Sequence, residues 1–211
     1  MTFLLGGYQT DFARNWKKEG KEIADVIEEV VAGGLAACDL PAADVGVGHV
    51  ANFAAELYAM QGQLGGFLVQ TQPEFAGLPT SRHEAACASG SVAVLAATAE
   101  LEAGRYDLAM VVGIEQMKTV DSARGGDFLG TAGWYERESK GVDYPFPSLF
   151  GRLGDEYERR FGLKNEHLKR ISEINFGNAK RNPLAQTRAW GEDADKMSQT
   201  IAGRIDRKSV V

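Results

Sequence analysis

The fold is decided by residues 80–114, which read TSRHEAACASGSVAVLAATAELEAGRYDLAMVVGI. Residues 80–85 have the character of a short strand that leads up to Cys87. Residues 88–99 contain no charged side chain, and a helix without a polar face is expected to be buried on every side. Residues 108–114 form a continuous apolar run, which is typical of a strand covered on both faces. Strand, helix and strand in this order predict a right-handed βαβ unit in a mainly parallel sheet.

The preceding residues add further strand and helix segments. Residues 3–5 precede a glycine pair and are interpreted as a short first strand. Apolar residues recur at helical spacing between residues 21 and 38, which predicts a surface helix packed on a core. Residues 45–53 are a second strand candidate, and residues 56–69 a weaker helix. The first 118 residues therefore predict a core with the element order βαβαβαβ.

The chain changes character after Lys118. Glycines and prolines punctuate a long irregular stretch as far as Pro147. Two helices are then predicted, at about residues 149–161 and 165–180. We place a boundary near residue 119 and treat residues 119–211 as a separate, inserted unit. Strand-like character returns at residues 201–211, so we expect the chain to be incomplete.

The amino-acid composition argues against several classes of protein. The 211 residues are 44% hydrophobic and 25% charged, as in an ordinary globular protein. No stretch approaches the roughly 20 apolar residues that span a bilayer, so we expect no membrane span. The two cysteines lack the paired spacing of zinc sites, so neither a metal nor a disulfide is expected, and a cytoplasmic location is the default.

Charge is distributed unevenly along the chain. The net charge is −6, but residues 1–118 hold 7 Lys and Arg against 15 Asp and Glu, whereas residues 119–211 hold 16 against 14. Either this is chance variation on a solvated surface, or the second segment meets a polyanion such as a nucleotide phosphate. No dense basic stripe is present, so a nucleic-acid partner is not expected.

Cys87 is the candidate nucleophile. It lies where a predicted strand meets a predicted helix, and Ser89 and Gly90 follow it. Its side chain would meet the open N–H groups of the first helical turn, which favour a negative charge and so a nucleophilic thiolate. The same N–H groups can stabilise an oxyanion on a thioester carbonyl. The alternative is that Cys87 is a buried, inert small residue.

Several blocks of the sequence resemble the thiolase superfamily. Residues 82–91, RHEAACASGS, are similar to its nucleophile segment, and residues 111–117, VVGIEQM, to its Gly-x-Glu-x-Met strand end. Residues 151–186 resemble the insertion of the sterol-carrier-protein type of thiolase, and Asn52-Phe53 and Gln61-Gly62 fit the same branch. Together these blocks cover nearly the whole chain in the right order.

The resemblance implies an α/β chain with a thiolase-like layered αβαβα fold. The chain would be the N-terminal half, with an inserted, mainly helical loop domain that grips coenzyme A. Cys87 would take an acyl group from an acyl-coenzyme A and pass it to a second thioester or back to coenzyme A. Met117, Ser89 and Gly90 are the expected substrate-binding residues. Coenzyme A would be substrate or product, and no permanently bound cofactor is expected.

The coenzyme A phosphates need cationic partners. The weakly basic second segment suggests Lys180, Arg181 and Arg188 for this role.

The resemblance also implies parts that this sequence lacks. In thiolases the activating histidine and a second cysteine come from the C-terminal half. We therefore expect this chain to be inactive alone, to need that half or a complementing subunit, and to form a homodimer or tetramer. Two other functions stay open: a thiolase-fold aldolase of steroid side-chain breakdown, and a non-catalytic protein that binds acyl-coenzyme A or lipid.

The remaining candidates have structural interpretations. His83 precedes Cys87 by four residues, which in a strand spans about 13 Å, too far for a pair. His49 and His167 are not expected to be catalytic, and Cys38 is expected to be a packing residue at a helix end. Glu115 follows a predicted strand, and the resemblance implies that it is a hydrogen-bonding group near the site rather than an acid catalyst.

Overall fold

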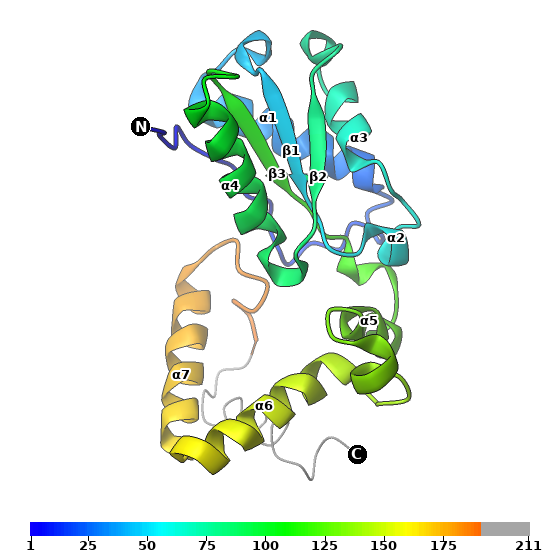
Figure 1. Cartoon of the computed structure of the whole chain (residues 1–211), viewed down its shortest axis with the longest axis vertical. Helices are drawn as coiled ribbons and strands as arrows, with labels where there is room; N and C mark the ends of the chain where they lie inside the picture. The colour runs from blue at the N-terminus through cyan, green and yellow to red at the C-terminus, as the bar shows by residue number, and fades with distance from the viewer. Residues whose placement is uncertain (191–211) are drawn as a thin grey trace. The chain divides into compact units, whose positions relative to one another are not determined.

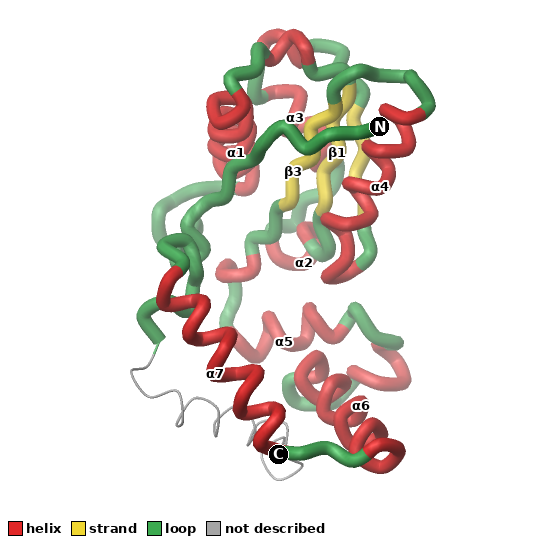
Figure 2. The backbone as a smooth tube through the Cα atoms, turned by 90° about the vertical axis from the view of Figure 1, so that its left-hand side faces the viewer, coloured by secondary structure: helices red, strands yellow, loops and turns green. Residues whose placement is uncertain are grey.

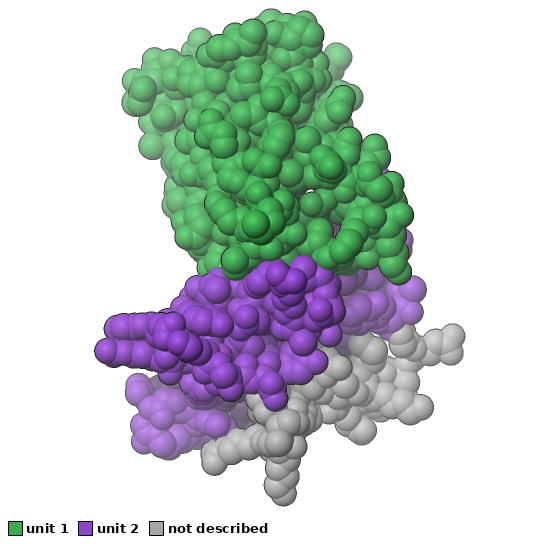
Figure 3. Space-filling view, turned by 90° about the vertical axis from the view of Figure 1, so that its right-hand side faces the viewer, with its two compact units in different colours: residues 1–10, 15–119 green, residues 11–14, 120–211 purple. Residues whose placement is uncertain are grey.

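The computed structural model describes residues 1–190. The chain divides into two compact units, coloured separately in Figure 3. The first unit comprises residues 1–10 and 15–119, and the second comprises residues 11–14 and 120–211. The break after Thr119 lies beside the boundary that the change in glycine and proline content predicts. None of the helices among the described residues is long and apolar enough to span a bilayer.

The first unit is built around a parallel sheet of three strands, β1 (Val47–Ala51), β2 (Thr80–His83) and β3 (Ala109–Gly113). The strand order is β2-β1-β3, and both pairings are parallel (Figure 1). Ala51 pairs with His83 on one side and with Gly113 on the other. The carboxyl ends of all three strands therefore meet at the same edge of the sheet.

Helices cover both faces of this sheet. The helices α1 (Ile23–Cys38) and α3 (Leu64–Gln70) lie on one face, and α4 (Ser89–Glu102) lies on the other (Figure 2). The predicted βαβ unit, formed by β2, α4 and β3, is confirmed. The core between the sheet and the helices α1 and α3 contains apolar side chains that are fully buried: Ile27, Val50, Leu64, Leu68 and Phe75.

The prediction of a single helix over residues 56–69 is wrong in one respect. It contains a short helix, α2 (Ala55–Tyr58), and then α3, with a break between them. Met60 and Gln63 have left-handed backbones with φ values of 54° and 52°, which interrupt a right-handed helix. Apolar periodicity alone does not reveal such a break.

The strand predicted at residues 3–5 is wrong. Residues 1–11 contain no strand, and residues 1–9 are exposed. A strand needs a hydrogen-bonding neighbour, and residues 3–5 pair with neither of the free edges that β2 and β3 offer in the described sheet. The strand predicted at residues 108–114 is confirmed as β3, but its covering is uneven, because Val111 is 36% exposed whereas Val112 is buried.

The prediction that the uncharged helix is buried on every side is wrong for the described residues. On α4 the residues Ser89, Ala93 and Ala97 are buried, whereas Val94 and Leu95 are 52% and 68% exposed. The small buried residues allow close packing on β1 and β3. Within residues 1–190, the sheet covers one face of this helix, and apolar side chains remain exposed on the other.

The described part of the second unit is mainly helical. It contains α5 (Ser122–Gly130), α6 (Pro145–Phe161) and α7 (Asn165–Arg181), so the prediction of a wholly irregular stretch before residue 149 is wrong. The Asp121 side chain accepts a hydrogen bond from the Arg124 N–H at 2.9 Å and caps α5. Pro145 is tolerated because it occupies the first position of α6. The predicted helix over residues 165–180 is confirmed to within one residue, whereas residues 201–211 lie outside the described part of the chain.

Candidate active site

Cys87 lies in a 3-10 turn, Ala86–Ala88, that joins β2 to α4 and is continuous with the start of that helix. The cysteine is exposed, so the alternative of a buried, inert residue does not describe its position. Ala86 has a left-handed backbone with φ 48°. This conformation is energetically unfavourable for a residue with a Cβ atom, and it turns the chain sharply from β2 into α4.

Hydrogen bonds hold this turn from both sides. The Ala85 N–H donates to the Ser89 hydroxyl oxygen at 2.9 Å, and that hydroxyl donates to the Ala86 carbonyl at 2.7 Å. The Ala88 N–H donates to the Ala85 carbonyl at 2.9 Å. The Ala86 N–H donates to the Glu84 carboxylate at 2.6 Å. The cysteine therefore sits on a braced segment of main chain.

A second group of polar residues lies at the same sheet edge. Asn52 directly follows β1 and is 2% exposed, and Glu115 follows β3. The Asn52 amide donates to the Ile114 carbonyl at 2.7 Å and to Glu115 at 3.2 Å. The Glu115 carboxylate also accepts from the N–H groups of Phe53 at 2.9 Å and Ala54 at 3.3 Å. Burial raises the pKa of Glu115, against the opposing effect of these donated hydrogen bonds.

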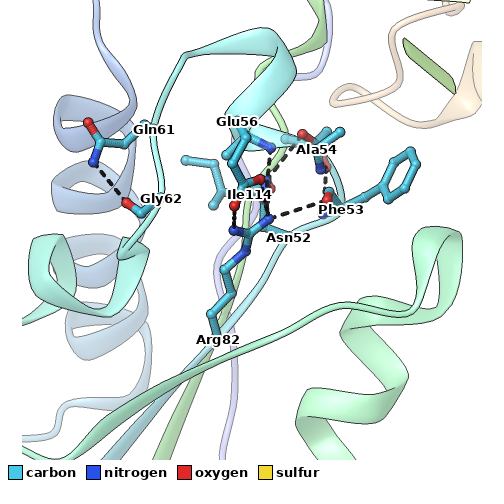
Figure 4. A network of polar contacts seen from close by, with 10 residues as sticks. Asn52, Phe53, Ala54, Glu56, Gln61, Gly62, Arg82 and Ile114 are labelled. Atoms are coloured by element: carbon cyan, nitrogen blue, oxygen red, sulfur yellow. Dashed lines mark hydrogen bonds and ion pairs between the residues drawn. The ribbon is translucent and has the colours of Figure 1, made fainter. Parts of the chain in front are cut away.

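Arg82 on β2 completes this network. Figure 4 shows its side chain extending toward Asn52, Phe53 and Glu56. Its guanidinium donates to the side-chain Oδ1 of Asn52 at 2.8 Å and forms an ion pair with Glu56. The hydrogen bonds that Arg82 donates to Glu56 raise the pKa of Arg82 and lower the pKa of Glu56. Side chains from the ends of all three strands thus fix the edge from which the chain leads to Cys87.

A cluster of two histidines lies beneath α4. His49 on β1 is 2% exposed, and its Nδ1 lies 2.9 Å from Nε2 of His83 on β2. The Ser81 hydroxyl lies 3.1 Å from the first of these nitrogens and 2.8 Å from the second. The other nitrogen of His49 lies 3.5 Å from the Glu100 carboxylate on α4. His83 therefore contacts His49 and Ser81 rather than forming the Cys87 pair that its place in the sequence invites.

The histidine cluster predicts a loss of stability in mild acid. Burial is the main cause that lowers the pKa of His49 below its ordinary value of 6.5; Glu100 opposes the shift and His83 adds to it. The unfolded chain therefore binds the proton more readily. The contribution of neutral His49 to the free energy of unfolding is fully present above pH 6.5 and is lost as the pH falls through 6.5 toward the lowered pKa. Thermal melts from pH 8 to pH 5 should show this loss.

His167 offers the matched control for these melts. Its side chain is 66% exposed on α7, so His167→Gln should keep the acid loss of the unmodified chain, whereas His49→Gln should flatten it. Parallel acid profiles for His49→Gln and the unmodified chain would contradict the assignment to His49.

The other predicted site residues are placed as follows. Met117 is 42% exposed just after β3, and Gly90 in the first turn of α4 faces open space. Arg188 is already engaged, because it forms a two-pronged ion pair with Asp11 at 2.7 and 2.8 Å. The Arg181 guanidinium donates to the Asn178 side chain at 2.6 Å. The assignments of Lys180, Arg181 and Arg188 to coenzyme A, and of Met117 and Gly90 to the substrate, stay predictions.

Metal-binding geometry does not occur in the described part of the chain. Among residues 1–190, no three His, Cys, Asp or Glu side chains are grouped so that they could hold a metal ion.

The fold and the site together define a parallel α/β domain that presents an exposed cysteine at the start of a helix. The family model for the N-terminal domain of thiolase matches residues 3–187, and the chain belongs to this family. It is 30% identical over 184 residues to the acetyl-CoA acetyltransferase of Methanothermobacter thermautotrophicus and 31% identical over 186 residues to that of Methanocaldococcus jannaschii. It is 23% identical over 195 residues to human sterol carrier protein 2.

These matches cover 87% of the chain in each case. They cover 46% and 45% of the two archaeal proteins and 34% of the human protein. The chain therefore spans about half the length of the archaeal relatives that it matches. The family membership and the layered α/β fold predicted from the sequence are confirmed.

Proposed function

We propose that the chain is the nucleophile-bearing half of an acyl-coenzyme A acyltransferase of the thiolase type. The observation that carries the proposal is the position of Cys87, exposed on a braced turn at the start of α4. The archaeal relatives, which are acetyl-CoA acetyltransferases by name, support the same reaction class. Coenzyme A is then a substrate or product, and not a resident cofactor.

The first step forms an acyl-cysteine. The Cys87 thiolate attacks the thioester carbonyl, a bond forms between its sulfur and the acyl carbon, and the coenzyme A thiolate leaves and takes up a proton. We propose that N–H groups of the first turn of α4 stabilise the oxyanion of the tetrahedral intermediate, because the first N–H groups of a helix lack intrahelical partners. In the second step the bond from the acyl carbon to Cys87 breaks and the Cys87 thiolate leaves, while the acyl carbon bonds either to the α-carbon of a second thioester, which has given up a proton to a base, or to the thiolate of coenzyme A. The covalent intermediate divides one difficult transfer into two easier ones.

The proposal includes a second half of the enzyme. None of the three histidines of this chain is assigned as the base for Cys87, because His49 and His83 contact each other and His167 is exposed on α7. We propose that the base within hydrogen-bond reach of the thiol comes from a C-terminal half or a complementing subunit. The exposed apolar residues Val94 and Leu95 on α4 support such a covering partner.

We further propose that the assembled enzyme is a cytoplasmic homodimer or tetramer. Both β2 and β3 are edge strands of the described sheet and leave one row of backbone groups unpaired. Light scattering of the purified protein checks this assembly, and a monomer mass would oppose it.

The experiment that tests the acyl-cysteine compares the acetyl labelling of Cys87 with that of Cys38. The chain, together with the second half that supplies the base, is incubated with acetyl-CoA, digested and mapped by mass spectrometry. We expect an acetyl group on Cys87 and not on Cys38, complete loss of this label in Cys87→Ala, and full retention in Cys38→Ala. Equal labelling of both thiols would show only general thiol chemistry and would oppose the proposal. Binding of coenzyme A without any acyl-cysteine would favour a non-catalytic binding protein instead.

A further inference from the structure

We infer that Ser89 is a positioning residue for Cys87, because its hydroxyl locks the left-handed turn at Ala86 on which the cysteine is carried. The inference rests on the proposed function of Cys87. It assigns to the serine a role through the main chain rather than a contact with the substrate.

The turn needs such a lock because its backbone is unfavourable by itself. Ala86 has φ 48°, in the left-handed region, which costs a residue with a Cβ atom roughly 1–2 kcal/mol. Ala85 before it is also outside the helical and extended regions, with φ −156° and ψ 47°. Ala86 would relax toward a right-handed or extended backbone unless other contacts held it.

Ser89 supplies contacts on both sides of the strained residue. Its oxygen accepts from the Ala85 N–H at 2.9 Å, and its proton goes to the Ala86 carbonyl at 2.7 Å. The first group belongs to the Glu84–Ala85 peptide unit and the second to the Ala86–Cys87 unit, so the φ and ψ angles of both Ala85 and Ala86 lie between the two groups that the hydroxyl connects. The hydroxyl thus bridges the turn, and rotation of either peptide unit breaks one of its two hydrogen bonds.

The burial of Ser89 indicates that it positions the turn and does not contact the substrate. Ser89 is 5% exposed, whereas the neighbouring Cys87 and Gly90 are exposed. The only proton of its hydroxyl is already given to the Ala86 carbonyl, so it has no donor left for a thioester oxygen. The other side-chain brace, Glu84, is exposed and holds only the Ala86 N–H. Ser89 is therefore the buried side chain that ties both peptide groups.

The test compares Ser89→Ala with a variant that removes the strain by another route. Iodoacetamide is added to the chain at several pH values, and the alkylation rate of Cys87 is measured relative to that of Cys38. We expect Ser89→Ala to lower this ratio by about tenfold, because small displacements of a reacting group have large effects on rate. Glycine adopts the left-handed region without cost, so Ala86→Gly added to Ser89→Ala should restore most of the ratio.

Two controls make the outcome specific. Ser91→Ala removes an exposed hydroxyl from the same first turn of α4 and should leave the ratio unchanged. Ser89→Thr keeps the hydroxyl and should stay close to the unmodified chain. General unfolding would speed the alkylation of both cysteines, so it is distinguished from a selective slowing at Cys87. An unchanged ratio in Ser89→Ala, or no rescue by Ala86→Gly, would overturn the inference.

The alkylation experiment does not depend on acyl transfer. A chain in which Ser89 controls Cys87 alkylation but acetyl-CoA labels neither thiol would keep the positioning role and reject the proposed function. Acetyl labelling of Cys87 that is insensitive to Ser89 would do the reverse.

Discussion

Replacement of Asn52 by alanine is expected to lower the free energy of unfolding by about 3–5 kcal/mol, because two of its hydrogen bonds are to charged groups and each is worth roughly 1.5–3 kcal/mol. The amide donates to Glu115 at 3.2 Å, and its carbonyl oxygen accepts from Arg82 at 2.8 Å. It also bonds to the Ile114 carbonyl at 2.7 Å and to the Ala55 N–H at 2.9 Å. Alanine would leave these groups without that partner at a position that is 2% exposed. Urea denaturation followed by circular dichroism measures the loss.

Gln61→Ala is the matched control for this amide. Gln61 is only half-buried, and its side chain donates to the adjacent Gly62 carbonyl at 2.8 Å, as Figure 4 shows. Its removal should change the free energy of unfolding by no more than about 0.5 kcal/mol. If the two substitutions had equal effects, the polar network would be a surface feature and would not fix the sheet edge beside the cysteine turn.

The sequence is informative where a local pattern has one structural solution. The strand-like residues before Cys87, the small residues after it and the apolar run beyond predict the strand, helix and strand that the structure contains. The exposed position of Cys87 at the helix start follows from that order. The helix at residues 165–181 is equally well marked, because Asn182 and Pro183 end its apolar periodicity.

The polar clusters could not be predicted in the same way, because they depend on strand register. His49 meets Ser81 and His83 only because β1 and β2 are parallel and His49 pairs with Ser81. Asn52 and Glu115 are far apart in the sequence and meet because their strands end at one edge. Polar residues directly after parallel strands were the available signal for that meeting.

The wrong predictions also arise because local sequence does not specify which other segments a strand or helix contacts. Residues 3–5 have the apolar character of a strand, but a strand must also pair with a neighbour, and local sequence does not specify whether residues 3–5 pair with a free edge of the sheet. The uncharged stretch after Cys87 indicates burial on every side, whereas within residues 1–190 the sheet covers one side of α4. Composition predicts that an apolar face is to be covered, and it does not identify what covers it.

Gly65→Ala and Gly66→Ala are expected to have opposite effects on stability although the two glycines are adjacent in α3. A Cβ atom on Gly65 would lie 2.4 Å from the Thr80 hydroxyl oxygen and 3.0 Å from its Cβ, so α3 and β2 would have to move apart. Overpacking of this kind costs about 1–3 kcal/mol. A Cβ atom on Gly66 would meet only the Gln63 side chain at 3.6 Å, an ordinary contact. Alanine there should gain about 0.5–1 kcal/mol, because glycine is entropically unfavourable inside a helix.

The pair also tests whether the packing of α3 reaches the cysteine. Thr80 is the first residue of β2, the strand that carries Arg82 and leads into the turn at Ala86. A displaced β2 should therefore slow the alkylation of Cys87 relative to Cys38 in Gly65→Ala, whereas Gly66→Ala should leave that ratio unchanged. Urea denaturation and the alkylation ratio are measured on the same two proteins. Destabilisation by Gly65→Ala with an unchanged ratio would mean that the hydrogen bonds of Ser89 and of the Asn52 network fix the turn independently of where β2 begins.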